Sequence, residues 1–349
     1  MTRIGMNPAR HRATTYRPAR VTVAMLVYLP HRQGYFEHRL DVIKLSLASL
    51  IRHTDLEYDL LVFDNSSCEE LKDYLRGLQQ QGVLRYLLSS SENIGKLGAL
   101  RLMAGAAPGE VLAYTDDDTF FYPGWLSAHV ALLDGFPNVG MVSGSPERTN
   151  FDHATASTVR FGQNDPETHM SLGRRIPDQW ERDWAIALGK DPDEFLSQVS
   201  QVDDVLLARR GLQAYGTACH NQFVAPKAAM RTLLERSWSG RLMGGMTEVD
   251  NAIDAAGFLR LTTVERTTRL IGNVVSPTME SEARRLGVDV HGQPWGSFVA
   301  SRRPTVMRLL LRGPVRRLLQ GLYNRLFWLL SGQSSEWLTR ESQNGEKDS

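Results

Sequence analysis

The sequence has very little cysteine. Only two of its 349 residues, Cys68 and Cys219, carry a thiol. Two cysteines cannot build the disulfide framework of a small secreted domain or a cysteine-rich metal site. We therefore expect a protein that folds around a hydrophobic core in a reducing cytoplasm.

Long apolar runs and an excess of charge of one sign are also missing. No uninterrupted apolar run reaches the roughly 18 residues of a membrane-spanning helix, so none is predicted. Residues 1–20 are basic and polar and lack the apolar stretch of a secretory signal, which predicts a disordered lead-in. The formal net charge of +1 provides no basic surface for nucleic acid, so we expect no nucleic-acid partner.

Strand-like and helix-like segments alternate in the first half of the chain. Short apolar runs typical of strands buried on both faces lie at 21–29, 58–63, 84–88, 111–114 and 139–142. Segments with helical spacing separate them, at 39–51, 68–78, 96–106 and 124–133. This alternation predicts an α/β fold with a mainly parallel sheet flanked by helices.

Residues 145–215 have a different character. They are polar, contain four prolines, and show only short amphipathic pieces at 179–188 and 194–207. We interpret this segment as an insertion or lid. Regular patterns then resume, with a strand at 218–224, a helix at 226–236, an acidic helix at 248–256 and strand-like residues at 258–273.

Acidic residues follow two of the predicted strands. Asp64 ends the run at 58–63, and Asp116, Asp117 and Asp118 follow the run at 111–114. The carboxyl ends of parallel strands are where α/β sheets bind ligands. Three adjacent carboxylates need positive charge nearby, which Mg²⁺ or Mn²⁺ supplies while also holding substrate phosphates. An acidic surface turn explains the run alone equally well, but its position after a buried strand favours a site.

Four motifs in order, VTVAMLVYLP, LLVFDNSS, SENIGKLGALR and YTDDDTFFYPGWL, resemble those of the GT-A fold glycosyltransferases of family 2. The resemblance covers about residues 21–142, and a weaker similarity extends over residues 217–273. It implies a Rossmann-like sheet with a nucleotide-sugar-binding half at 21–144 and an acceptor-binding half at 216–300.

The resemblance also assigns roles around the donor. It implies that Asp64 contacts the nucleotide base, and that Asp116 and Asp118 bind the ribose and, through a metal, the diphosphate. Asp117 lies between these two residues. The family's Asn-x-Gly loop beside the nucleotide falls on Asn93, Gly95 and Lys96. An Asx turn at Asp64 and a solvated lysine at position 96 are the structural alternatives.

The implied reaction is metal-dependent transfer of a sugar from a UDP- or GDP-sugar to a hydroxyl group, with inversion. The acceptor would be a saccharide or a lipid-linked molecule in surface polysaccharide or glycoconjugate synthesis. Inversion needs a base for the acceptor hydroxyl. The family pattern places Glu248 at the base and Asp250 two residues later, and we favour Glu248. Either acid could instead complement the dipole at the start of a helix.

The sequence departs from the family in one respect and leaves the acceptor side open. Residues 264–273 lack the histidine that helps many members bind the metal, although His291 could fold back to supply a ligand. His220 and Asn221 are candidate acceptor contacts. Trp125 could stack on a sugar ring, although a core position is the better interpretation.

Residues 302–330 carry seven arginines and no acidic residue, with leucines, Phe327 and Trp328 between them. Two basic amphipathic helices in 301–330 would suit the face of an anionic membrane, or they would pack on the catalytic domain. A polar tail, 331–349, follows.

Two other functions compete with a transferase. A nucleotidyltransferase that makes the nucleotide sugar would use a related sheet and metal, but residues 30–34 imitate its glycine-rich basic loop poorly. The second competing function is that of a non-catalytic nucleotide-sugar-binding subunit. The incomplete acidic pair at 247–248 and the missing histidine keep this alternative open.

Overall fold

The structure is a computed structural model, and it describes residues 9–10, 13–148, 151, 153–234, 240–242, 245–288 and 322. The chain divides into two compact units, residues 1–296 and 297–349. The predictions for His291, for the amphipathic helices apart from Leu322, and for the polar tail lie outside the described residues. In the part of the chain that is described, no helix is long and apolar enough to cross a membrane.

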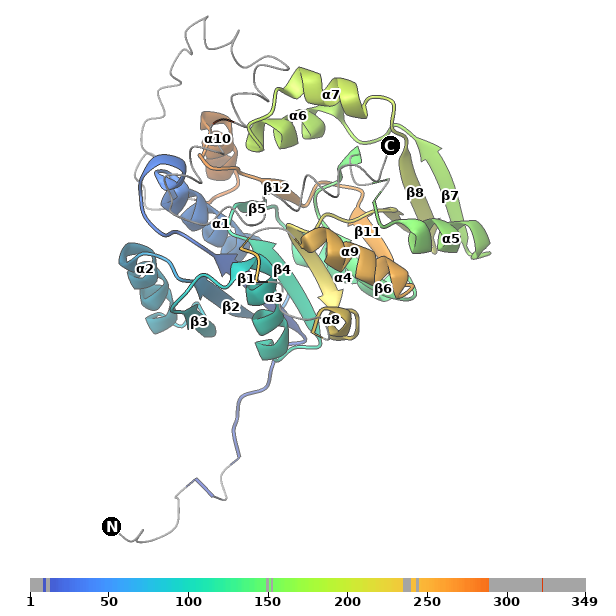
Figure 1. Ribbon diagram of the computed structural model, residues 1–349. Helices are drawn as coiled ribbons and strands as arrows, with labels where there is room; N and C mark the ends of the chain where they lie inside the picture. The colour runs from blue at the N-terminus through green and yellow to red at the C-terminus, as the bar shows by residue number, and fades with distance from the viewer. Residues whose placement is uncertain are drawn as a thin grey trace, which may run out of the picture. The chain divides into compact units, whose positions relative to one another are not determined.

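A ten-stranded sheet forms the centre of the first unit (Figure 1). Its order is β3-β2-β1-β4-β10-β6-β11-β9-β8-β7. The strands are β1 (Val21–Val27), β2 (Tyr58–Asn65), β3 (Tyr86–Ser90), β4 (Val111–Asp116), β6 (Val139–Ser143), β7 (Thr168–Gly173), β8 (Asp204–Arg209), β9 (Leu212–Tyr215), β10 (Gln222–Pro226) and β11 (Leu259–Thr263). In this described sheet only β10, β9 and β7 run against the other strands. The predicted α/β class and mainly parallel sheet are therefore confirmed.

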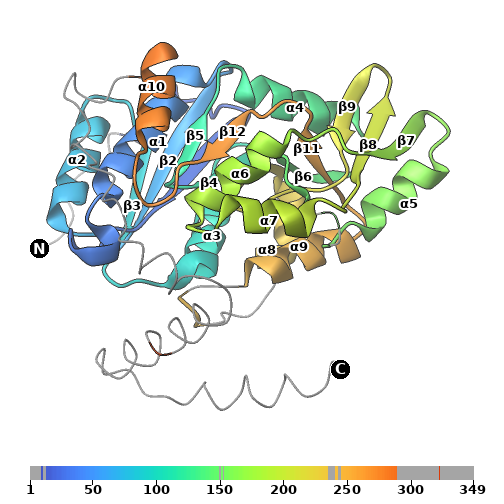
Figure 2. The ribbon, with the colours of Figure 1, turned by 90° about the horizontal axis from the view of Figure 1, so that it is seen from above.

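Helices cover both faces of the sheet (Figure 2). They are α1 (Arg39–His53), α2 (Glu69–Gln80), α3 (Gly95–Ala106), α4 (Trp125–Gly135), α5 (Ala156–Asn164), α6 (Asp178–Ala187), α7 (Pro192–Val199), α8 (Lys227–Leu234), α9 (Met246–Ala255) and α10 (Pro277–Arg285), with a short 3-10 turn, η1 (Gly34–Phe36). Residues from α1, α2 and α4 share one hydrophobic cluster with the sheet, and residues from α3, α8 and α9 share another.

Strand β1 shows why both faces are covered. Val23 and Met25 belong to the cluster with α1 and α4, whereas Ala24 and Leu26 belong to the cluster with α3 and α9. Successive side chains of a strand point to opposite faces, so an uninterrupted apolar run fills two cores at once. Each large side chain buried in this way contributes about 1.5–3 kcal/mol.

The segment at 145–215 differs from the prediction. Strand β7 pairs with β8, β8 pairs with β9, and β9 pairs with β11, so these strands extend the central sheet instead of forming a separate lid. The single amphipathic piece expected at 194–207 is divided between α7 and β8. Arg148 organises this region from a buried position, 3.0 Å from Asp178 at the start of α6 and 3.2 Å from Asp204 at the start of β8. The sequence pattern missed these strands because they are only half-buried.

Two further predictions need correction. The Tyr16 hydroxyl donates to Asp59 Oδ2 at 2.7 Å and the Ala19 amide donates to the same oxygen at 3.0 Å, so the end of the lead-in is held against β2 instead of being disordered. The run at 258–273 is divided between β11 and β12 (Thr268–Leu270), and β12 pairs with β5 (Thr119–Phe121).

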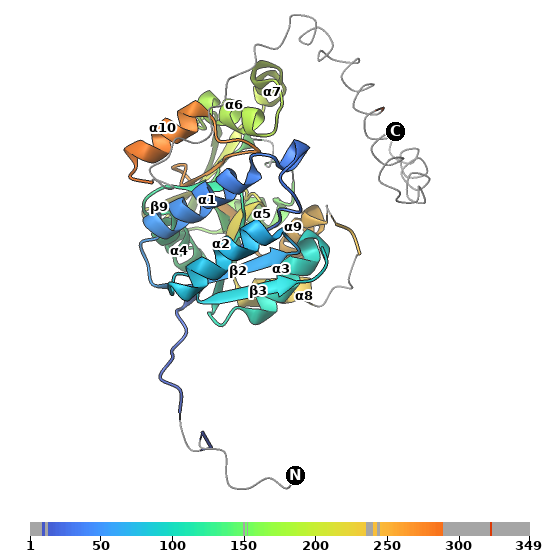
Figure 3. The ribbon, with the colours of Figure 1, turned by 90° about the vertical axis from the view of Figure 1, so that its left-hand side faces the viewer.

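Polar contacts connect α6 with α10. Arg269 on β12 lies 3.1 Å from Asp183 of α6 and 2.7 Å from Glu282 of α10. Both helices lie at the same end of the sheet in Figures 1 and 3. The region expected as a lid is thus joined by charged side chains to the last described helix.

Candidate active site

The strand register brings the predicted acidic residues to one edge of the sheet. Strand β1 lies between β2 and β4, and its last residues pair with both: Val27 is opposite Asp64, and Leu26 is opposite Asp116. Neighbouring strands are about 4.8 Å apart, so the two carboxylates flank the end of β1. We call Asp64, Asp116, Asp117 and Asp118, together with Lys96 and Arg39, the acidic edge.

Asp116 is the last residue of β4 and is held by two neighbours. Its Oδ2 lies 2.6 Å from Lys96 Nζ, and its Oδ1 accepts a hydrogen bond from the Tyr114 hydroxyl at 2.6 Å. The Asp116 side chain is still 21% exposed. Lys96, which the sequence left open as a solvated lysine, is therefore a paired cation of the acidic edge.

Arg39 at the start of α1 neutralises the other two carboxylates. Its guanidinium donates to Asp117 Oδ1, and it also lies 3.1 Å from Asp118 Oδ2. Asp117 is buried and accepts a further hydrogen bond from the Tyr28 amide. Burial raises the pKa of Asp117, and the charge of Arg39 acts in the opposite direction. Asp117 thus fixes the turn, while Asp116 and Asp118 remain partly exposed on either side of it.

The run Asp116–Asp118 has one carboxylate oxygen that no described residue contacts by a hydrogen bond. Asp118 Oδ1 is buried and has no hydrogen bond among the described residues. The three carboxylates of the run Asp116–Asp118 face two cations, Lys96 and Arg39, which leaves one negative charge uncompensated. A hard, positively charged ligand is what this remaining oxygen and charge can accept. No group of three or more His, Cys, Asp or Glu side chains within the described residues forms a complete metal shell, so substrate or water oxygens would have to complete one.

Asp64 and the loop at Asn93 form a connected polar network. Asp64 Oδ1 accepts from the Ser67 amide at 2.9 Å, the Asx turn considered above, but its buried Oδ2 has no partner among the described residues. Asn65 donates to Asn93 Oδ1 at 2.9 Å, and that oxygen also accepts from the Gly95 amide at 2.9 Å. The turn after β2 and the start of α3 are therefore held together.

Gly95 is required by its surroundings. Its φ is +76°, and a Cβ at this position would lie 2.1 Å from the carbonyl oxygen of Arg241. The next residue, Lys96, donates its amide to the Leu242 carbonyl at 3.1 Å. Arg241 and Leu242, which precede α9 in the chain, therefore lie directly against the start of α3.

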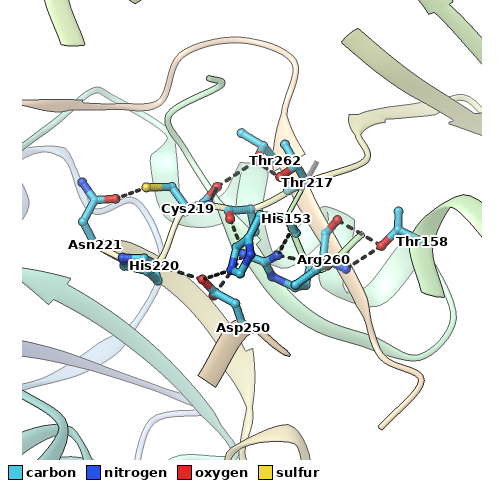
Figure 4. Close-up of polar contacts among 12 residues, drawn as sticks. His153, Thr158, Thr217, Cys219, His220, Asn221, Asp250, Arg260 and Thr262 are labelled. Carbon is cyan, nitrogen blue, oxygen red and sulfur yellow. Dashed lines mark hydrogen bonds and ion pairs between the residues drawn. The ribbon is translucent and has the colours of Figure 1, made fainter. Parts of the chain in front are cut away.

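A second cluster surrounds Asp250 on α9 (Figure 4). His220 Nδ1 lies 2.7 Å and His153 Nε2 lies 3.2 Å from Asp250 Oδ2. Arg260 NH2 lies 3.0 Å from Oδ1, close enough for an ion pair but outside hydrogen-bond geometry. We call these four residues the aspartate–histidine cluster.

The structure separates the two acids that were candidates for the base. Asp250 is fully buried and faces three partners, whereas Glu248, in the first turn of α9, is exposed. Asn221 lies between the cluster and the acidic edge, because its carbonyl accepts the Asp116 amide at 2.9 Å.

Trp125 does not meet the requirement for a sugar contact. Its side chain is only 1% exposed, its indole donates to Thr54, and it packs on Phe121. A buried aromatic ring has no free face to offer a substrate, so the suggested stacking role is wrong and the core position is correct.

Sequence reasoning missed Arg39, Asn65, His153 and Arg260. Each makes its contact with residues far away in the chain, such as Arg39 with Asp117 and Arg260 with Asp250. No local pattern marks such residues, although a buried acidic run implies that some cation must be nearby.

The fold and the acidic edge define a class, an α/β protein with a mainly parallel sheet and carboxylates at the carboxyl ends of its strands. Residues 35–183 match the family model described as "Glycosyl transferase family 2". The resemblance inferred from the sequence is thereby confirmed: this part of the chain matches glycosyltransferase family 2.

Several solved structures are similar to the chain. A mannosyltransferase, PcManGT from Pyrobaculum calidifontis, in complex with GDP-Man and Mn²⁺, is 26% identical over 40% of this chain and 38% of its own, with a TM-score of 0.30. TarS of S. aureus is 12% identical over 77% of this chain and 64% of its own, with a TM-score of 0.42. GalNAc-T7 with UDP, GalNAc and Mn²⁺ is 14% identical over 83% of this chain and 53% of its own, with a TM-score of 0.45.

The chain thus spans between 38% and 64% of the length of these three proteins. A search of curated proteins finds no match.

Proposed function

We propose that this chain is a glycosyltransferase that moves a sugar, with inversion, from a nucleoside-diphosphate sugar to a hydroxyl group of a saccharide or lipid-linked acceptor. The observation that carries this proposal is the acidic edge within a family 2 domain. Its carboxylates lie at the carboxyl ends of β2 and β4, on either side of β1, which is the usual ligand position in such sheets.

The acidic edge fits a divalent cation and a diphosphate. Asp116 and Asp118 would hold Mn²⁺ or Mg²⁺, and the unpartnered Asp118 Oδ1 is the oxygen best suited to do so. When bound, the cation neutralises the charge that develops on the departing diphosphate. Lys96, already fixed by Asp116, would add a positive charge beside the phosphates.

The residues at the end of β2 would bind the nucleoside. The unpartnered Oδ2 of Asp64 is an acceptor suited to an N–H group of the base. The backbone at Asn93 and Gly95 is locked by the Asn65 side chain, so this wall of the site would be formed before the nucleotide arrives. A pre-formed wall reduces the entropy lost on binding.

Calorimetry with UDP and GDP, each with and without Mn²⁺, tests the proposal. We expect one of the two nucleotides to bind, more tightly with Mn²⁺, and Asp118→Ala to abolish the Mn²⁺-dependent part. Asp73→Ala, on the exposed face of α2, is the matched control and should bind like the wild type. If neither nucleotide binds the wild type, the proposal is wrong. Pyrophosphate release from a nucleoside triphosphate and a sugar phosphate would instead indicate a nucleotidyltransferase.

A further inference from the structure

Asp250 is the centre of an arrangement that the donor site does not use. Its carboxylate is fully buried, and a single oxygen, Oδ2, faces two imidazoles: His220 at 2.7 Å and His153 at 3.2 Å (Figure 4). The three residues come from different parts of the chain: the loop before β10, helix α9, and the segment before α5. A buried carboxylate is costly unless its charge is compensated, and Arg260 supplies that charge.

The buried carboxylate determines which ring nitrogen of His220 carries a hydrogen. A carboxylate only accepts hydrogen bonds, so Nδ1 must be the donor toward Asp250. In the neutral ring, Nε2 then has a lone pair directed away from Asp250. Nε2 has no hydrogen-bond partner among the described residues, and the His220 side chain is 36% exposed. Asp250 thus leaves His220 Nε2 as the proton acceptor for a molecule that enters from solvent.

The backbone that carries His220 is fixed before any substrate binds. The Ala218 carbonyl accepts from Arg260, and the Thr217 carbonyl accepts from the Thr262 hydroxyl at 2.6 Å. The Cys219 amide donates to the Ser143 hydroxyl at 3.0 Å. Side chains from β11 and β6 therefore take the place of a neighbouring strand. The sequence predicted that this strand begins at residue 218. These side-chain contacts explain why β10 begins at Gln222 instead.

The same loop touches the acidic edge. The carbonyl of Asn221, the residue after His220, accepts the Asp116 amide at 2.9 Å, and Gln222 pairs with Thr115. His220 is thus one residue away from the backbone that holds the proposed diphosphate site. If a donor binds at the acidic edge, an acceptor hydroxyl that approaches it comes close to the loop that carries His220.

From this geometry we propose that His220 is the base of the transfer reaction and that Asp250 is its positioning residue. This inference rests on the function proposed above. The acceptor hydroxyl gives its proton to His220 Nε2 while its oxygen forms a bond to the anomeric carbon of the donor. The bond from that carbon to the diphosphate breaks, and the electron pair leaves with the diphosphate. Asp250 stabilises the imidazolium, which returns its proton to solvent after the product departs.

The proposal replaces Glu248 as the base. Glu248 is on the same helix, two residues before Asp250, but its side chain is exposed. His220, in contrast, is held in place by the buried carboxylate of Asp250, 2.7 Å from its Nδ1. The two assignments make opposite predictions for single substitutions, so one set of variants distinguishes them.

The experiment measures UDP or GDP release from UDP- and GDP-hexoses, with water or monosaccharides as acceptors, for the full chain. His220→Gln and His220→Asn should lower kcat by about 100-fold or more, the usual contribution of a base, and leave nucleotide affinity unchanged. His220→Asn retains a donor toward Asp250, which guards against loss of folding. Asp250→Asn should lower kcat in the same direction, and Glu248→Gln should retain kcat within about threefold of the wild type.

Two further variants separate chemistry from structure. Free imidazole should restore part of the activity of His220→Ala, but none of the activity of Asp250→Asn, because only the first variant leaves a space for the missing base. His169→Gln, an exposed histidine on β7, is the matched control and should behave like the wild type.

The inference is overturned if Glu248→Gln abolishes release with nucleotide binding intact, or if His220→Gln or His220→Asn retains kcat near the wild type. Both outcomes leave the proposed transferase function standing. Absence of nucleotide binding in the wild type would contradict that function itself, so the two failures are distinguishable.

Discussion

The acidic edge and the aspartate–histidine cluster solve the same electrostatic problem in different ways. The acidic edge gathers Asp64 and the run Asp116–Asp118 around Lys96 and Arg39. Among the described residues, Asp64 Oδ2 and Asp118 Oδ1 have no hydrogen-bond partner. The cluster has one carboxylate, Asp250, with Arg260 and two histidines around it. The acidic edge is short of positive charge, whereas the cluster is not.

This difference indicates what each region can accept. A site with surplus negative charge is suited to a cation. A site whose carboxylate is already paired with an arginine has no need of one, and its charge can instead hold a neighbouring imidazole in position. This contrast is consistent with the two proposed roles, in which the acidic edge binds the donor and the cluster accepts the proton of the acceptor hydroxyl.

Removal of Asp250 should have the largest effect on stability. Asp250→Ala leaves Arg260, which is 1% exposed, buried without its counter-charge, and the loss of one partner of a buried pair costs about 3–5 kcal/mol. Urea unfolding followed by circular dichroism measures the change. Glu248→Ala, on the exposed side of the same helix, should cost less than about 1 kcal/mol. Similar values for both variants would show that the cluster does not stabilise the fold.

Removal of Arg39 tests whether the acidic edge is short of positive charge. Arg39→Met leaves Asp117 and Asp118 without their main cation, and we expect a loss of about 3 kcal/mol in the free energy of unfolding. Mn²⁺ should restore part of this loss, because it supplies positive charge to the same carboxylates. It should not restore Asp250→Ala.

The control is Arg20→Met, because the Arg20–Asp134 pair is about half exposed and should contribute less than about 1 kcal/mol. If Mn²⁺ stabilises the wild type and Arg39→Met equally, the cation does not replace Arg39.

The same contrast explains which features could be predicted from the sequence. β1, β2 and β4 are buried on both faces, so their apolar runs were unmistakable, and the acidic residues after them had to lie at their ends. β7 and β8 lie at the far edge of the sheet and are only half-buried, with residues such as Asp204 and Arg209 that belong to ion pairs. Their polar pattern looked like an insertion because tertiary contacts, not local periodicity, make them strands.

The two candidate sites differ in the same way. Asp64 and Asp116 are close because parallel strands carry them to a common edge, which the order of motifs already implies. His153, His220, Asp250 and Arg260 converge from four segments, and nothing in the spacing of these residues predicts the contact. The sequence therefore favoured Glu248 as the base, since family position was the only guide, while the buried environment of Asp250 was invisible.

Gly95 tests how closely the loop before α9 must approach α3. In Gly95→Ala the new Cβ would lie 2.1 Å from the Arg241 carbonyl, at a φ of +76°, so we expect a loss of about 2 kcal/mol and weaker nucleotide binding. Gly105→Ala, in the same helix with nothing within 4 Å of a new Cβ, should be neutral or slightly stabilising. Thermal unfolding and calorimetry compare the two. Equal stability of both variants would mean that the loop can move away at little cost.

Substitution of Asp64 should have the smallest effect on stability. It also tests most directly how the acidic edge differs from the aspartate–histidine cluster. Asp64→Asn retains an oxygen to accept the Ser67 amide, so the free energy of unfolding should change by less than about 1 kcal/mol. The buried Oδ2, which has no partner among the described residues, would become an NH₂ group that can no longer accept a hydrogen bond from a nucleotide base. Calorimetry should therefore show UDP or GDP affinity about tenfold weaker, the loss of roughly one hydrogen bond to a charged group.

Asp73→Ala, on the exposed face of α2, is the control, because it leaves Asp64 and its turn unchanged and should match the wild type in stability and in nucleotide affinity. A fall in stability without a fall in affinity would mean that Asp64 serves the turn alone. A fall in affinity at unchanged stability would mean that the second oxygen of Asp64 is kept for a ligand, as proposed for Asp118 Oδ1, whereas Asp250 Oδ1 has the Arg260 guanidinium 3.0 Å away.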